Sequence, residues 1–199
     1  MRFMSGIVMG ALLFLPCSLW AQRYHGQAAQ PEMDLAMTYS AQRADLTTGS
    51  NFWPQGGSAE LTSTFFHGLG VAADVTGTHS ENISPSGTGL TLVTATFGPT
   101  YTWALPHHGK SSWQWKFFGE SLVGIANGVD SVFPNPNGPQ TSANGLALQV
   151  GGGADLDLSR HFAVRLLQAD WLRTQLPNAT TNVQNNLQLS AGIVFRLLR

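Results

Sequence analysis

The 199-residue chain contains a single cysteine, Cys17, and few charged residues: Asp, Glu, Lys and Arg together make up 11% of the sequence, against about 25% in an average soluble domain. Cys17 lies in an N-terminal segment that we expect to be removed, so the mature chain has no cysteine for a disulfide, a thiolate nucleophile or a metal site. The formal net charge is −1 and no basic cluster is present. The sequence therefore lacks the electrostatic signature of a nucleic-acid-binding protein.

Beyond its N-terminal segment, the sequence also lacks any long apolar run and any sustained 3.6-residue period. Both absences argue against membrane-spanning helices and against a helical bundle. The chain instead contains 22 glycines and many Ser, Thr, Asn and Gln residues, with a hydrophobic content of 43%. This composition suits a protein whose outer surface contacts lipid and whose inner face is polar.

The first 21 residues have the organisation of a cleaved secretory signal peptide. A short basic start precedes an apolar run over residues 7–15, and the small residue Ala21 ends the segment. The apolar run is too short for a transmembrane helix, which needs about 20 residues. A lipoprotein cleavage site at Cys17 is the less favoured alternative, because Pro16 rather than a small residue precedes it. We therefore expect the chain to be exported.

The last stretch of the chain, residues 185–199, alternates between apolar and polar side chains. One parity holds Leu187, Leu189, Ala191, Ile193, Phe195 and Leu197, and the other holds Gln188, Ser190, Gly192, Val194 and Arg196. Successive side chains of a strand point to opposite faces, so the pattern predicts a strand with one apolar and one mostly polar face. A length of about a dozen residues exceeds that of most soluble strands and suffices for a tilted strand that crosses a bilayer. We therefore predict that this stretch closes a transmembrane barrel.

Seven further strand-like segments precede it, which gives eight predicted strands within residues 34–199, after a flexible periplasmic lead-in at residues 22–33. They cover residues 34–42, 58–66, 71–76, 89–103, 113–125, 146–158 and 162–172. The connections alternate long and short, beginning and ending with a long one, and the third long connection covers residues 127–144. Bacterial outer-membrane barrels have an even number of strands, short periplasmic turns and long extracellular loops. We therefore predict an all-β, antiparallel, up-and-down transmembrane β-barrel with both termini in the periplasm.

Two irregularities are expected within these strands. Gly98-Pro99 interrupts the fourth strand and predicts a bulge or a kink there. In the seventh strand Arg165 and Asp170 lie on opposite parities. A bulge near Leu167 is therefore needed to turn both side chains inward.

Aromatic residues gather near the predicted strand ends, where a membrane barrel carries girdles at the lipid–water boundary. The candidate girdle residues are Phe65, Trp103, Trp113, Trp115, Phe162 and Phe195 at the periplasmic ends and Trp171 at the other end. The alternative is that they are ordinary strand-end aromatics of a soluble barrel.

Eight strands enclose an interior just wide enough for side chains. The charged residues that we expect to point into it are Glu60, Asp74, Lys116, Glu120, Asp155, Arg165, Asp170 and Arg196, with Asp34 and Asp157 as further inward carboxylates. Because an isolated buried charge is costly, we hypothesise that Lys116, Arg165 and Arg196 are each bridged by surrounding carboxylates. Such a network is a structural plug, and a gated pore through it is the alternative.

The sequence resembles the small eight-stranded outer-membrane barrels, a porin-like superfamily that includes outer-membrane protein A transmembrane domains and opacity-type proteins. The resemblance covers about residues 34–195, and it is carried by FGPTY at residues 97–101, VGGGADLDL at 150–158 and SAGIVFR at 190–196. It implies a barrel that the outer-membrane assembly machinery inserts. Such barrels usually end on an aromatic residue that this machinery reads, whereas this chain ends in two leucines and an arginine. Phe195 is then the candidate to replace the terminal aromatic.

We assign no catalytic, cofactor-binding or metal-binding residue. The six histidines lie in the lead-in, in turns or at a loop, and none stands in a Ser/His/acid arrangement. The adjacent His107 and His108 are interpreted as solvated turn residues rather than as a metal site. The glycines at 151–153 precede no helix, so they form no phosphate cradle.

The sequence therefore favours a non-enzymatic, monomeric outer-membrane barrel with a structural or surface-interaction role through four long extracellular loops. Its expected partners are outer-membrane lipid, the barrel-assembly machinery and an unidentified extracellular ligand. A narrow pore or a lipid-active barrel is the alternative. A soluble lipocalin-like carrier is a further alternative, and it would place apolar residues inside and polar residues outside.

Overall fold

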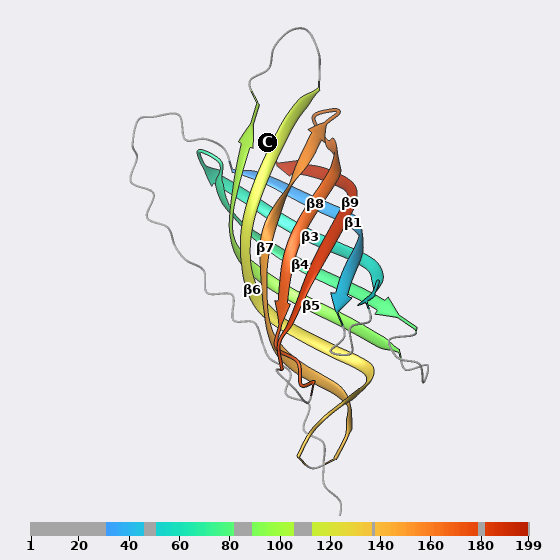
Figure 1. Cartoon of the computed structure of the whole chain (residues 1–199). Coiled ribbons are helices and arrows are strands. Elements are labelled where there is room, and N and C mark those ends of the chain that lie inside the picture. Colours follow the sequence, from blue (N-terminus) through green and yellow to red (C-terminus); the bar gives the residue numbers. More distant parts are fainter. Residues whose placement is uncertain are drawn as a thin grey trace, which may run out of the picture.

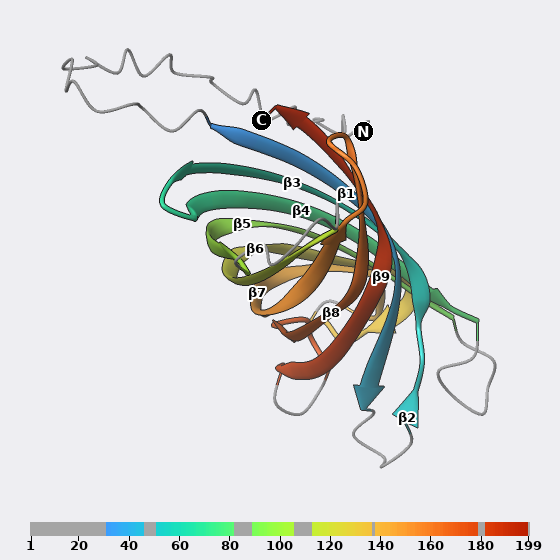
Figure 2. The same cartoon turned by 90° about the horizontal axis from the view of Figure 1, so that it is seen from above.

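The structure, a computed structural model, describes residues 31–45, 51–81, 89–105, 113–136, 138–178 and 182–198. Within them the chain is all-β, with an antiparallel sheet that closes on itself into a barrel (Figures 1 and 2). The expected signal peptide at residues 1–21 and the expected lead-in up to residue 30 lie outside the described residues. No described helix is long and apolar enough to cross a membrane.

Eight long strands follow one another around the barrel, and the two-residue β2 pairs with the end of β1. The strands are β1 (Glu32–Asp45), β2 (Asn51–Phe52), β3 (Gln55–Phe66), β4 (Leu69–Ser80), β5 (Leu90–Ala104), β6 (Gln114–Phe133), β7 (Gln140–Asp157), β8 (Phe162–Thr174) and β9 (Gln184–Leu198). The long strands pair in chain order, and β9 pairs back onto β1, which closes the sheet. The predicted fold class is confirmed. β1 begins at Glu32, slightly before the predicted start of the domain.

The strands form where the side chains alternate, because each wall of a barrel faces two different environments. In β4, Val71, Ala73 and Val75 are exposed on the outside, whereas Ala72 and Asp74 are buried inside. A slip by one residue would exchange the two faces, so the inward and outward sets hold the register of every strand.

The β6–β7 hairpin is longer than predicted. The sequence predicts a loop over residues 127–144, whereas β6 continues to Phe133 and β7 begins at Gln140. Within this extension Asn127 pairs with Asn144, and the Asn127 Nδ2 donates to the Asn144 Oδ1 at 2.5 Å. Cross-strand pairing therefore overrides the turn preference of the local Asn and Gly residues. The hairpin protrudes at the lower end of Figure 1.

The bulge predicted near Leu167 is present. The register of β8 shifts between Arg165 and Gln168 against β9, and it shifts at the same place against β7. The extra residue brings Arg165, Gln168 and Asp170 to the inside, where all three are buried.

Of the bulge or kink predicted at Gly98-Pro99, the bulge is absent, because the β5–β6 ladder keeps one register on both sides of these residues. A Cβ added to Gly98 would lie 2.2 Å from the backbone carbonyl oxygen of Ser121 on β6. The glycine therefore serves the close approach of two backbones rather than a bulge.

Candidate functional site

The outer wall of the barrel is apolar over a height that matches a bilayer. The outward positions of β6 run through Trp115, Phe117, Gly119, Ser121, Val123 and Ile125 before Asn127. From Trp115 to Ile125, with a rise of about 3.3 Å per residue and a strand tilt of about 40°, the wall spans about 25 Å. This is the height of the apolar band of transmembrane barrels.

The outward positions become polar at the end of the barrel from which the β6–β7 hairpin protrudes. The polar residues there are Arg43, Gln55, His79, Thr91, Asn127, Asn144, Arg173 and Asn185. Between these residues and the opposite end, the outward positions of the described strands carry no Asp, Glu, Lys or Arg. The polar boundary is therefore sharp on the hairpin side.

The seven aromatic residues singled out in the sequence lie on the outer wall. Six of them are exposed by 41–61%, namely Phe65, Trp103, Trp113, Trp115, Phe162 and Trp171. Phe195 is half-buried against Phe162, with 5.4 Å between the ring centroids. All except Trp171 lie toward the end opposite the hairpin. The arrangement provides aromatic rings near the edges of the apolar wall.

The inner wall is charged toward the end opposite the hairpin. All eight charged residues of the expected interior network are buried there or in the middle of the lumen: Glu60, Asp74, Lys116, Glu120, Asp155, Arg165, Asp170 and Arg196. Asp34 and Asp157, expected as further inward carboxylates, join them, and the structure adds Glu32. The fold therefore gathers residues from seven strands into one confined space.

Two cations lie nearest the end opposite the hairpin. The Arg196 guanidinium donates to Asp34 and to the Asp157 Oδ1, the latter at 2.5 Å. The Lys116 Nζ lies 2.8 Å from the Glu32 Oε2 and 4.0 Å from the Asp157 Oδ2. Glu32 falls in the predicted lead-in, although its parity with Asp34 could have revealed it as an inward residue.

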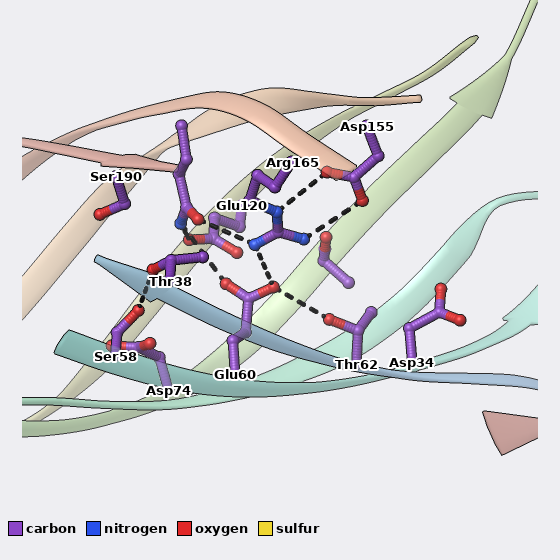
Figure 3. A network of polar contacts seen from close by, with 12 residues as sticks. Asp34, Thr38, Ser58, Glu60, Thr62, Asp74, Glu120, Asp155, Arg165 and Ser190 are labelled. Carbon is purple, nitrogen blue, oxygen red and sulfur yellow. Dashed lines mark hydrogen bonds and ion pairs between the residues drawn. The ribbon is translucent and has the colours of Figure 1, made fainter. Parts of the chain in front are cut away.

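Arg165 occupies the middle of the lumen (Figure 3). Its Nη1 lies 2.9 Å from the Glu60 Oε1, and its Nε lies 2.9 Å from the Asp155 Oδ1. The same Nη1 donates to the Gln168 Oε1 at 2.8 Å, and the guanidinium lies 4.1 Å from the centroid of the Phe118 ring. The hydrogen-bonding groups and one face of this cation are therefore engaged, and such hydrogen bonding is the condition under which a buried guanidinium is tolerated.

Three other central carboxylates form no salt bridge with a described cation. Asp74 accepts a hydrogen bond from the Thr76 hydroxyl at 2.8 Å. The Glu120 Oε1 accepts from Gln149 and Gln168, at 3.2 and 3.0 Å. Neither oxygen of Asp170 has a hydrogen-bond partner among the described residues. The middle of the lumen therefore holds more carboxylates than cations. The amides of Gln149 and Gln168 were not expected in this network, although their inward parity marks them.

Nearer the hairpin the lumen becomes neutral and then apolar. Ser40 and Ser190 share a hydrogen bond of 2.8 Å, and the Thr78 hydroxyl donates to the Gln42 Oε1 at 3.3 Å. Beyond this polar layer lies an apolar cluster made of Leu92, Ala126, Phe133, Ala147, Leu172 and Leu176. The lumen is thus filled by side chains in three layers, and the extension of β6 supplies Phe133 to the outermost layer.

The described residues offer little for catalysis or metal binding. No group of three or more His, Cys, Asp or Glu among them could hold a metal ion. His79 and Thr91 form a pair at 2.8 Å, but the Thr91 hydroxyl donates to the Asp130 Oδ2 at 2.9 Å. The Nδ1 of His79 must then donate to Thr91, so it is not positioned to take the hydroxyl proton as a general base.

No protein-family model and no curated protein sequence matches the chain. Solved structures do resemble it. Neisserial surface protein A has a TM-score of 0.56 and 14% identity, over 83% of this chain and 97% of that one. Ail, the attachment invasion locus protein of Yersinia pestis, in a complex with the heparin analogue sucrose octasulfate, has a TM-score of 0.52 and 17% identity, over 84% of this chain and 100% of Ail. The chain therefore has the fold of the small eight-stranded outer-membrane β-barrels.

Proposed function

We propose that the chain is a non-enzymatic, monomeric protein of the bacterial outer membrane, with a structural or surface-interaction role. The observation that carries this proposal is the contrast between the two faces of one sheet. The outer wall is apolar over about 25 Å, and the lumen holds paired charges, amides and hydroxyls. A soluble ligand carrier needs the reverse arrangement.

The hairpin end is the proposed extracellular end. The connections there are the long ones, and the β6–β7 hairpin extends past the polar boundary at Asn127. The end opposite the hairpin, with the short β3–β4 and β7–β8 turns, is then periplasmic. Phe195, close to the end of β9, is the proposed aromatic signal for the barrel-assembly machinery.

The filled lumen supports a plug rather than a wide channel. Charged pairs occupy its periplasmic and central layers, and the apolar cluster around Phe133 closes the extracellular layer. A narrow pore is the alternative. The surplus of central carboxylates favours this alternative, because negative charges in a pore would select cations. Single-channel recordings should show no steady conductance. A steady current would refute the plug and support the pore.

The extracellular ligand is proposed to be something other than a polyanion. Ail was solved with a heparin analogue. In this chain the proposed extracellular segments carry two basic residues, Arg43 and Arg173. They carry three acidic residues, Asp45, Glu81 and Asp130, and the remaining loop residues are uncharged. Because acidic residues outnumber basic ones, electrostatics does not favour a sulfated polymer here.

The first experiment is fractionation of cells that express the full chain, with gel migration before and after boiling. We expect the protein in the outer membrane, a detergent requirement for its extraction and a band whose migration shifts on heating. A periplasmic protein released without detergent would contradict the proposal. Removal of residues 130–141 from the hairpin, followed by binding of whole cells to surface-coated matrix proteins, then tests the interaction role.

A further inference from the structure

A cavity of about 610 Å³ opens at the end of the barrel opposite the hairpin. It is lined by Arg160, His161, Arg196, Leu197 and Leu198, and we call it the rim cavity. The β7–β8 turn and the end of β9 form it together, and they lie side by side in Figures 1 and 2. The Arg196 backbone N–H donates to the His161 carbonyl oxygen at 2.9 Å, which holds the two segments together.

The two arginines of the rim cavity differ in their partners. Arg196 is 6% exposed, and Asp34 and Asp157 hold its guanidinium inside the lumen. Arg160 is exposed and forms no ion pair with a described residue. Its neighbour His161 is also exposed and uses its backbone, not its ring, in the described hydrogen bonds. Among the described residues of the rim cavity, the charge available to a ligand therefore comes from Arg160, with the His161 ring beside it.

The other side of the rim cavity is apolar. Leu197 and Leu198 are 51% and 53% exposed, and the adjoining outer wall carries the Phe162–Phe195 ring pair. These rings lie at the edge of the apolar wall, so the rim cavity lies at the depth of lipid headgroups in the proposed membrane orientation. A free anion would gain nothing from the two leucines, whereas a lipid would bury apolar surface against them.

We propose that the rim cavity binds the phosphate of an anionic glycerophospholipid from the periplasmic leaflet. Arg160 and the His161 ring contact the phosphate, because a guanidinium forms charge-assisted hydrogen bonds to phosphate oxygens. The glycerol backbone and the acyl chains lie along Leu197, Leu198 and Phe162. This inference rests on the proposed outer-membrane location.

The test uses the mature full chain, purified in neutral detergent with equal amounts of phosphatidylglycerol and phosphatidylcholine, and native mass spectrometry of the retained lipid. We expect one phosphatidylglycerol to be retained in preference to phosphatidylcholine by about tenfold, and Arg160→Gln to abolish this preference. Arg173→Gln, at the opposite end of the outer wall, is the matched control and should leave the preference unchanged. Leu197→Ser should lower retention of the lipid.

Three results would overturn the proposal: equal retention of both lipids, an unchanged preference in Arg160→Gln, or competition by soluble glycerol phosphate at the same concentration as the lipid. The last result would identify a site for free anions. Membrane fractionation and the heat-shifted band are recorded on the same preparations. A folded outer-membrane barrel that retains no phosphatidylglycerol would therefore refute lipid binding in the rim cavity and leave the proposed location in the outer membrane intact.

Discussion

Arg165 and Glu60 form an ion pair of 2.9 Å across the lumen, although β9 and β1 separate their strands in the sheet. Backbone pairing joins each strand only to its neighbours. This side-chain pair instead connects two parts of the wall through the interior, and both residues are buried. Asp155 on β7 also binds Arg165, so one guanidinium links β3, β7 and β8.

Arg165→Met should lower the free energy of unfolding by about 3–5 kcal/mol, because it removes the cation that compensates the buried Glu60 and Asp155 carboxylates. Urea unfolding in lipid vesicles, followed by tryptophan fluorescence, measures the change. The double variant Arg165→Met with Glu60→Gln removes both charges of the pair and should cost less than the single variant. A single variant that loses less than about 1 kcal/mol would show that the ion pair does not stabilise the barrel.

Asp170→Asn should stabilise the barrel by about 1–2 kcal/mol, because it removes a buried charge that forms no salt bridge with a described cation. Asp170 is 0% exposed, and neither of its oxygens accepts a described hydrogen bond. The matched control is Glu60→Gln, the same chemical change at a carboxylate that does bind a cation, and it should destabilise. Both variants are measured by urea unfolding. A loss of stability in Asp170→Asn would mean that the carboxylate is needed, for instance by a bound cation.

Gly98→Ala should destabilise by about 1–3 kcal/mol, since the new methyl group would overlap a neighbouring backbone. The added Cβ would lie 2.2 Å from the Ser121 carbonyl oxygen. Gly77 on β4 provides the control, because a Cβ there meets nothing within 4 Å. Gly77→Ala should change stability by less than about 0.5 kcal/mol. Equal effects of the two substitutions would show that strand propensity, not close approach, decides the outcome.

The alternation of side chains predicted the barrel because the period of a strand is local and appears directly in the sequence. It also placed Arg165 and Asp170 inside, once a bulge near Leu167 was allowed for. Local composition could not predict the extension of β6 and β7. Its Asn and Gly residues favour turns, and only pairing such as that between Asn127 and Asn144 reveals a hairpin.

The partners of the interior charges were less predictable than their burial. Parity tells which face a carboxylate occupies, but the choice of partner depends on how strands are staggered around the barrel. Lys116 therefore pairs with Glu32, a residue outside the predicted domain. In the same way, the sequence alone did not indicate that Asp170 would form no salt bridge with a described cation.

The location in a membrane makes a depth-dependent prediction for one strand. Val123 and Val129 both lie on the outward parity of β6, Val123 within the apolar wall and Val129 beyond the polar boundary at Asn127. Val123→Arg should cost about 2 kcal/mol because its charge faces lipid inside the apolar wall, one outward position from the Ile125 edge, whereas Val129→Arg should cost no more than about 1 kcal/mol. Urea unfolding in phospholipid vesicles provides both values. The same residue type, substitution and strand are used, so strand propensity cancels and the difference reports lipid depth. Equal costs at the two positions would place the wall of β6 in water, and would refute the membrane location while leaving the barrel fold unchanged.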